Sequence, residues 1–168
     1  MSMTIRRVAA KDIDSFFGVF TSCLRTQFPE YSNELIEAFL KRYWSKNKYR
    51  KQVKSKSKLL LGAWVGKKLV GVLDAGMPFG GVSLCAWVMV ELGFQRRGVG
   101  RKLIAEWTRI AKRAGAHSVY LYTDKRNSLY YKKLGFKKVG LWRGSWFGSD
   151  CLIYTKLIQK PRAKNYLR

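Results

Sequence analysis

The chain has 168 residues, a length that suits one domain and is short for two ordinary ones. Hydrophobic residues make up 47% of it and aromatic residues 14%, so it has enough apolar surface to offset chain entropy, and intrinsic disorder is excluded. The 34 Lys and Arg against 10 Asp and Glu give a formal net charge of +24. That charge favours anionic partners: phosphorylated cofactors, nucleic acid, acidic proteins or anionic lipid.

The cysteines and the apolar runs narrow the class of protein further. Three widely spaced cysteines without a C-x-x-C pair, and His117 as the only histidine, argue against a zinc module and a disulfide framework. No apolar run reaches the ~18–20 residues that span a bilayer, and the N-terminus lacks the apolar stretch of a secretory signal. We therefore expect a soluble, reduced, cytoplasmic protein without a metal cofactor.

The first half of the chain predicts one strand, two helices and a hairpin. A β-like segment near Thr4–Val8 is followed by a helix with Asp12 as its N-cap, and Asn33 is expected to cap a second helix. Two apolar, β-prone runs, Leu59–Val65 and Leu69–Ala75, are joined by a Gly-Lys-Lys turn, which is typical of a hairpin.

The second half predicts the centre of a sheet and the longest helix. Ser83–Leu92 is a nearly continuous apolar run, as in a strand that is buried on both faces. Helically spaced apolar residues from Val99 to Ala114 predict the long helix, with Gly115 as C-cap. The remaining expected elements are a strand, a short helix and two closing strands: Ser118–Thr123, Asn127–Leu134, Phe136–Leu141 and Cys151–Leu157. The order β-α-α-β-β-β-α-β-α-β-β predicts a mixed α/β fold, with one domain over residues 1–157 and a basic tail over 158–168.

Positive charge is concentrated in two stretches. Nine Lys and Arg lie between Lys41 and Lys58 without an intervening acid, and Lys156–Arg168 is a second basic run. These stretches are either a solvated helix end, loop and tail, or a surface for phosphate backbones. Tyr43, Trp44 and Tyr49 lie among the first set of charges and either stack on bases or belong to the core.

The most informative segment is Gln95-Arg96-Arg97-Gly98-Val99-Gly100, between the central strand and the long helix. Glycines permit positive φ and close backbone approach, so successive N–H groups can point into one concavity at the positive end of the helix dipole. This geometry binds phosphate, and the nearby Arg and Lys side chains reinforce it. The sequence of this segment lacks the Lys-Ser/Thr of a P-loop and the third glycine of a Rossmann turn.

The segment has the form Gln/Arg-x-x-Gly-x-Gly, and with its flanking strand and helix it resembles the acetyl-CoA signature of the GNAT superfamily of N-acetyltransferases. Tyr130-Tyr131-Lys132-Lys133-Leu134-Gly135-Phe136 resembles that family's Tyr-x-x-x-Gly-Phe motif. The resemblance covers nearly the whole chain. It implies a mixed, mostly antiparallel open sheet of about seven strands with helices on both faces.

The resemblance also implies a site for acetyl-CoA as acyl donor. Two central strands would splay apart around the pantetheine arm, backbone groups of the first strand would pair with it, and the glycine turn would hold the pyrophosphate. Tyr131 would protonate the leaving thiolate, because a pKa near ~10 keeps the phenol protonated at neutral pH; the other interpretation is a packed aromatic beside Phe136. The expected cofactor-binding residues are Val88, Met89, Val90, Gln95, Arg96, Arg97, Gly98, Val99, Gly100, Arg101, Asn127 and Tyr131.

The sequence departs from the family pattern in three places. The Asn often found seven residues before the motif tyrosine is Asp124 here, so Asn127 is our candidate to hydrogen-bond the cofactor. The Pro-Glu pair often found before the glycine turn is Leu92-Gly93. No residue matches a general base: Glu91 is the carboxylate nearest to the cofactor strand, and the alternatives are a water chain or no base at all. Its rivals are Asp74, Asp150 and His117.

These features predict an acetyl-CoA-dependent N-acetyltransferase that transfers the acetyl group directly to a primary amine. The cofactor phosphates account for only part of the charge, so RNA or an acidic protein is the expected partner through Lys41–Lys58 and the C-terminal tail, and aminoacyl-tRNA or a protein is the expected acceptor. A polyamine would call for an acidic pocket, which the few carboxylates disfavour. The alternative function is a non-catalytic module that senses acetyl-CoA or binds nucleic acid.

Two further features leave alternatives open. The aromatic residues Trp142, Trp146 and Phe147 precede the last strand, and they either line the acceptor pocket or cover the core. By analogy with the superfamily, the protein could form a homodimer.

Overall fold

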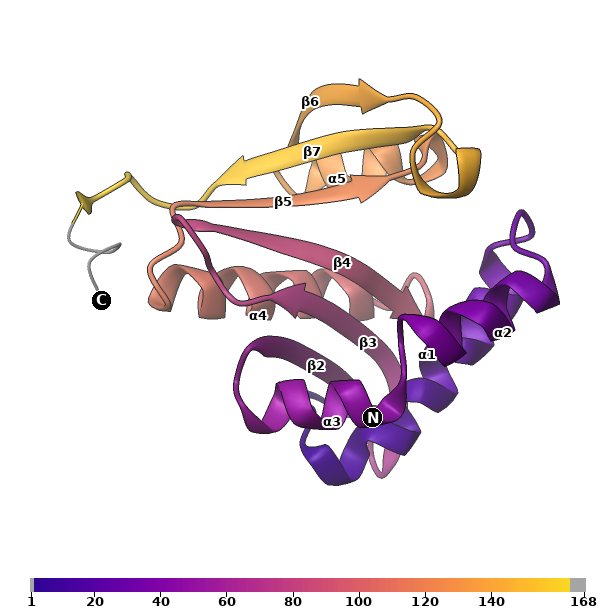
Figure 1. Cartoon of the computed structure of the whole chain (residues 1–168). Helices are drawn as coiled ribbons and strands as arrows, with labels where there is room; N and C mark the ends of the chain where they lie inside the picture. The colour runs from indigo at the N-terminus through magenta and orange to yellow at the C-terminus, as the bar shows by residue number, and fades with distance from the viewer. Residues whose placement is uncertain (1, 164–168) are drawn as a thin grey trace. The chain divides into compact units, whose positions relative to one another are not determined.

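The computed structural model describes residues 2–163, and it contains a seven-stranded sheet with the strand order β1-β2-β3-β4-β5-β7-β6 (Figure 1). The strands are β1 Met3–Arg7, β2 Lys58–Val65, β3 Lys68–Gly76, β4 Val82–Val90, β5 Ser118–Thr123, β6 Lys137–Trp142 and β7 Cys151–Leu157. The α-helices are α1 Ile13–Gln27, α2 Asn33–Arg42, α3 Lys46–Lys54, α4 Val99–Arg113 and α5 Ser128–Lys133. Strands β4 and β5 are parallel, whereas β1 with β2, β5 with β7 and β6 with β7 are antiparallel. This is the predicted mixed α/β class with a mostly antiparallel open sheet.

The chain divides into two compact units, and β4 and α4 contribute to both. Unit 1 consists of Met1–Ala75 and Trp87–Glu106, and unit 2 of Gly76–Ala86 and Trp107–Arg168. No helix among the described residues is long and apolar enough to cross a membrane.

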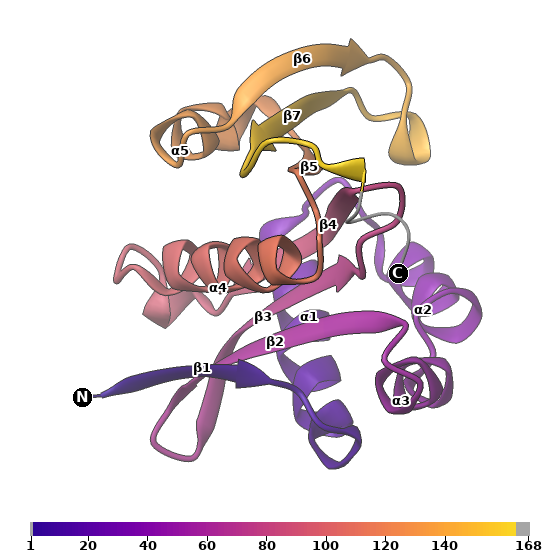
Figure 2. The same ribbon diagram turned by 90° about the vertical axis from the view of Figure 1, so that its left-hand side faces the viewer.

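The core of unit 1 is built on the apolar face of α1. Phe16 and Phe20, one helical turn apart, stack with ring centroids 5.9 Å apart, and Phe20 also meets the rings of Trp44 and Trp87 at 5.3 and 5.6 Å. Such aromatic contacts bury large areas and add to the hydrophobic gain. Figure 2 shows β1, β2 and β3 side by side in this unit.

Helix α3 was not predicted, because the segment was interpreted as a helix end and loop. Its N-cap is Ser45, whose Oγ accepts from the Lys48 N–H at 3.4 Å, and Tyr49 is its one buried residue. A single buried position leaves no apolar periodicity to detect. Tyr49 is 1% exposed and therefore cannot stack on bases, whereas Tyr43 is 58% exposed.

Asp12 is the N-cap residue of α1, as predicted, although its side chain makes no hydrogen bond to the helix, whereas the predicted N-cap of α2 is wrong by one residue. The Asp12 carboxylate accepts from the Ala9 N–H at 3.1 Å and closes the short 3-10 turn Ala10–Asp12. A hydrogen bond from Arg6 lowers the pKa of Asp12. Helix α2 is capped by Ser32, whose Oγ accepts from the Leu35 N–H at 3.2 Å, because Asn33 is already helical.

Gly71 on β3 allows the first turn of α4 to lie close to the sheet. A Cβ at this position would be 2.9 Å from Val99 Cγ1 and 3.3 Å from the Met89 carbonyl oxygen. Only glycine permits this approach without a shift. In this way β3 positions the start of α4, which carries the glycine turn.

Unit 2 packs one face of β5, β7 and β6 against its helices. Tyr131 of α5 meets Tyr154 of β7 and Phe136, with ring centroids 6.2 and 5.9 Å apart, and Trp107 of α4 stacks on Phe136 at 6.4 Å. The indole of Trp107 also donates to Ser83 Oγ of β4 at 3.0 Å. These contacts tie the motif tyrosine into the core of the unit.

The predicted tail begins with residues that are bound to α4. The Gln159 side-chain amide donates to the carbonyls of Ala116 and Lys112 at 2.6 and 3.1 Å, near the C-terminal end of the helix. The last five residues of the predicted tail, 164–168, lie outside the described residues.

Candidate functional site

The glycine turn joins the 3-10 turn Leu92–Phe94 to α4 through two residues with positive φ, Arg96 at 57° and Gly98 at 79°. The Lys102 N–H donates to the Gly98 carbonyl at 3.0 Å, which is the first hydrogen bond of the helix. In an α-helix the N–H groups that precede this bond point out of the N-terminus, at the positive end of the dipole. They belong to residues 98–101, so the turn presents a cluster of backbone donors suited to phosphate.

One predicted donor is used within the turn itself. The Gln95 N–H donates to the Leu92 carbonyl at 3.3 Å. Gln95 instead contributes its side chain, because Nε2 donates to the Val90 carbonyl at 3.2 Å and to Gln27 Oε1 at 3.1 Å. Gln27, the last residue of α1, donates to the same Val90 carbonyl at 2.9 Å. The two amides fix the glycine turn to the end of β4.

The end of β4 carries the residues expected to face the pantetheine arm. Met89 and Val90 are 2% and 9% exposed, and Val88 is half-buried. The side-chain amides of Gln27 and Gln95 occupy both lone pairs of the Val90 carbonyl. A ligand at this residue would therefore hydrogen-bond to its N–H and not to its carbonyl. The register between β4 and β5 runs from Val82 to Cys85, four of the nine residues of β4.

The surroundings of the turn are strongly cationic. Arg96, Arg97, Arg101 and Lys102 are all exposed. The Glu91 carboxylate lies at the end of β4 and forms an ion pair with Lys68 Nζ at 2.9 Å. A turn of this charge attracts a polyphosphate.

Tyr131 is held in unit 2 with little exposure. It is 9% exposed, and its ring contacts Tyr130 at 5.1 Å as well as Phe136 and Tyr154. Burial raises the pKa of Tyr131 well above its ordinary value. The phenol therefore keeps its proton at any physiological pH, which suits a proton donor and is equally compatible with a packed aromatic.

The departure at Asp124 has a structural explanation. Its Oδ1 accepts from the N–H groups of Arg126 at 2.7 Å and Asn127 at 3.3 Å, and its Oδ2 binds the Arg126 guanidinium at 2.7 Å. The carboxylate caps the 3-10 turn Lys125–Asn127. Asn127 is exposed and is the N-cap residue of α5.

Two of the rival bases, Asp74 and Asp150, are engaged elsewhere. The Asp74 carboxylate is 1% exposed, accepts from the Tyr49 hydroxyl and pairs with Lys58 Nζ at 2.9 Å. Asp150 accepts from the Gly144 N–H at 3.0 Å. His117 is half-buried, and its backbone N–H donates to a β3–β4 loop carbonyl. Within residues 2–163, no cluster of three His, Cys, Asp or Glu could hold a metal ion.

The predicted residues fall into two groups. Unit 1 brings together Val88, Met89, Val90, Glu91 and the glycine turn, whereas unit 2 contains Asn127 and Tyr131. Sequence reasoning missed Gln27 and Gly71. A glycine within an apolar strand is a recognised sign of close backbone approach and could have pointed to Gly71, whereas a glutamine at a helix end carries no such sign.

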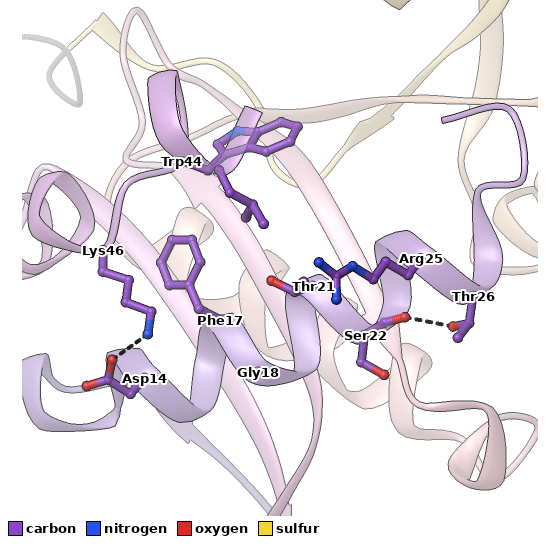
Figure 3. Close-up of a pocket in the computed structure, with 10 residues that line it drawn as sticks. Asp14, Phe17, Gly18, Thr21, Ser22, Arg25, Thr26, Trp44 and Lys46 are labelled. Carbon is purple, nitrogen blue, oxygen red and sulfur yellow. Dashed lines mark hydrogen bonds and ion pairs between the residues drawn. The ribbon is translucent and has the colours of Figure 1, made fainter. Parts of the chain in front are cut away.

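A groove of about 630 Å³ lies in unit 1 between α1 and the segment that joins α2 to α3 (Figure 3). Phe17, Leu40 and Trp44 form its apolar part. Asp14 pairs with Lys46 at 2.9 Å at one end, and Arg25 lies toward the other. None of the predicted cofactor-binding residues lines it.

Comparisons with known proteins identify the family to which this chain belongs. Residues 27–143 match the family model of the acetyltransferase (GNAT) domain. Spermidine N(1)-acetyltransferase of Thermoplasma acidophilum is 27% identical over 145 residues, which cover 82% of this chain and 89% of that protein.

Solved structures show the same fold. The PaiA N-acetyltransferase of Thermoplasma acidophilum, crystallised with coenzyme A, has a TM-score of 0.79 and 25% identity, with 94% of this chain and 99% of that chain covered. A ribosomal-protein-alanine N-acetyltransferase from Brucella melitensis has a TM-score of 0.72 and 20% identity, with 92% and 99% covered. Since the family model spans well over half of the chain, the protein belongs to the GNAT acetyltransferase family.

Proposed function

We propose that the protein is an acetyl-CoA-dependent N-acetyltransferase that moves the acetyl group directly from CoA to a primary amine. The observation that carries the proposal is the turn at Gly98, where a left-handed glycine precedes the exposed N–H groups of α4 among four basic side chains. Backbone N–H groups at a helix N-terminus bind phosphate without further specialisation.

In this proposal, the N–H groups of residues 98–101 and the guanidinium of Arg101 hold the pyrophosphate. Arg96 and Arg97 add charge that draws the cofactor in. Gln95 acts through its side chain, which holds the turn against the Val90 carbonyl. The N–H of Val90 and the backbone of Val88 pair with the pantetheine arm, and Asn127 hydrogen-bonds the cofactor.

The reaction requires an amine nucleophile, a stabilised oxyanion and a proton for the leaving sulfur. The amine nitrogen attacks the thioester carbonyl, and backbone N–H groups of β4 stabilise the charge that builds on its oxygen. As the C–S bond breaks, the Tyr131 hydroxyl protonates the CoA thiolate. The phenol is protonated at neutral pH, so its proton is available when the thiolate forms.

Glu91 is the proposed base for the amine proton. Its carboxylate is 24% exposed and is paired with Lys68, so it must exchange that ammonium for the incoming amine. A water chain that delivers the proton to solvent is the competing route.

The acceptor is a primary amine. A related protein is named for spermidine, and the few carboxylates of this chain favour instead an amine carried on RNA or on an acidic protein. The Lys41–Lys58 segment supports such a partner, since its exposed cations include Lys41, Arg42, Lys48, Lys51, Lys54 and Lys56.

The test is steady-state release of CoA thiol from acetyl-CoA in the presence of a panel of amines: spermidine, a lysine-containing peptide, an N-terminal alanine peptide and an aminoacyl-tRNA. We expect thiol release that depends on one amine class, together with a matching acetylated product. Thiol release that is the same with and without every amine would contradict transfer to an amine.

A further inference from the structure

The strands of unit 2 have one face on which none of the described helices of this unit packs. Directly opposed residues of an antiparallel pair place their side chains on the same face. The pairs Tyr120 with Thr155, Tyr122 with Ile153, and Trp142 with Cys151 therefore share one face. The opposite face carries Leu121 and Tyr154, which are buried on the side of α5.

This aromatic face, defined by Tyr120, Tyr122 and Trp142, forms a continuous row of rings. The ring centroids of Tyr120 and Tyr122 are 5.9 Å apart, and those of Tyr122 and Trp142 are 5.8 Å apart. Trp142 is 47% exposed, and both tyrosines are half-buried. Hydrophobic side chains this exposed do not contribute a closed core, and they mark an interaction surface.

The loop after Trp142 extends the row. Trp146 and Phe147 are 52% and 48% exposed, with ring centroids 6.3 Å apart. Their exposure contradicts the interpretation in which this loop covers the core. The Asp150 carboxylate accepts from the Gly144 N–H and thereby fixes the loop beside the strand ends.

The charges around this face are positive. Lys137 is paired in register with Thr155 and so lies on the same face, and Arg143 directly follows Trp142. The sequence of unit 2 contains only two carboxylates, Asp124 and Asp150, and both accept hydrogen bonds within their own loops. These positive charges would repel a polycation, whereas they would attract a polyanion that carries flat, stackable groups.

We propose that the aromatic face of β5, β7 and β6 binds single-stranded nucleic acid, with two or three bases stacked on Tyr120, Tyr122 and Trp142 and phosphates held by Lys137 and Arg143. An open sheet with aromatic rings on one face and basic residues at its rim is a recognised way to bind unstacked bases. The face is distinct from the glycine turn and from the Lys41–Lys58 segment, both of which belong to unit 1. The proposal does not depend on acetyl transfer.

The experiment measures fluorescence anisotropy of a labelled ten-nucleotide single-stranded RNA with the full chain, over a series of salt concentrations. Base stacking supplies about 1–3 kcal/mol per base, so Trp142→Ala should weaken binding roughly fivefold to 150-fold. Arg143→Gln should lower the slope of log affinity against log salt by about 0.7. The matched control is Phe79→Ala, which removes an exposed aromatic ring from the β3–β4 loop of the same unit and should leave the affinity unchanged.

Two results would overturn the proposal: no binding at 50 mM salt, or loss of binding with Phe79→Ala but not with Trp142→Ala. Trp142→Phe, which retains a ring, should keep most of the affinity and separates stacking from misfolding. Because this experiment measures RNA binding, its outcome is independent of the outcome of the thiol-release assay.

Discussion

Gly98 offers the sharpest test of the cofactor site, because alanine and aspartate at this position separate backbone strain from charge. The φ of 79° is left-handed, which costs a non-glycine residue roughly 1–2 kcal/mol. A Cβ would meet Arg101 Nη2 only at 3.9 Å, so no clash adds to this cost. Gly98→Ala should therefore lower Tm by about 2–8 °C for a chain of this size.

Gly98→Asp has the same strain and adds a negative charge where the pyrophosphate is proposed to bind. Two unit charges 4 Å apart repel by about 4 kcal/mol at an effective dielectric constant of 20, and we halve this figure for a partly exposed site. The resulting ~2 kcal/mol corresponds to a roughly 30-fold higher Kd for CoA.

The assay pairs calorimetric titration of CoA with thermal unfolding. Gly80→Asp is the matched control, because Gly80 has a φ of 58° and open space around its Cβ and belongs to unit 2, whereas the glycine turn belongs to unit 1. Gly98→Asp and Gly80→Asp should lose similar stability, and only the former should lose CoA affinity. Equal CoA affinity of Gly98→Asp and Gly98→Ala would refute the placement of the pyrophosphate.

Four further outcomes are expected. Tyr131→Phe should lower kcat by about 10²–10⁴ with little change in CoA affinity, and an unchanged kcat would return Tyr131 to a packing role. Tyr49→Phe removes a donor from the buried Asp74 carboxylate and should cost about 1–3 kcal/mol in urea unfolding. Burial raises the pKa of Tyr49, so its protonated form contributes stability that is present below pH ~10 and is lost at higher pH; the wild type should lose more stability than Tyr49→Phe as pH rises from about 9 to 11. Burial raises the pKa of Cys23 to about 12, so iodoacetamide at pH 8 should label half-buried Cys151 first, and rapid labelling of Cys23 would contradict the structure.

The elements that could be predicted well from the sequence are those with a strong apolar periodicity or a clear terminating residue such as glycine. The long helix ends close to Gly115, whose φ of 93° suits a C-cap, and β7 has the predicted bounds Cys151–Leu157. Helix α3 was missed because it buries only Tyr49, whose contacts with Phe16, Phe17 and Asp74 are tertiary and are encoded by no local pattern. The N-cap of α2 was misplaced by one residue because Ser32 and Asn33 are both good caps.

The site was predictable where it depends on local backbone chemistry and not where it depends on long-range contacts. The positive φ of Gly98 could be expected from the Gln/Arg-x-x-Gly-x-Gly motif. The contact between Gln27 and Val90 spans 63 positions of sequence, and the row of Tyr120, Tyr122 and Trp142 depends on the register of three strands. Such contacts are fixed by pairing and packing, which a single sequence does not display.

The most direct test of the central claim follows the acetyl group itself. Acetyl-CoA with a labelled acetyl group is incubated with the protein and with small-metabolite, protein and RNA fractions of a cell extract. We predict label in an amide linkage in one fraction, strongly reduced when Tyr131→Phe replaces the wild type. Bound CoA without label in any fraction would contradict acetyl transfer and favour a module that senses the cofactor.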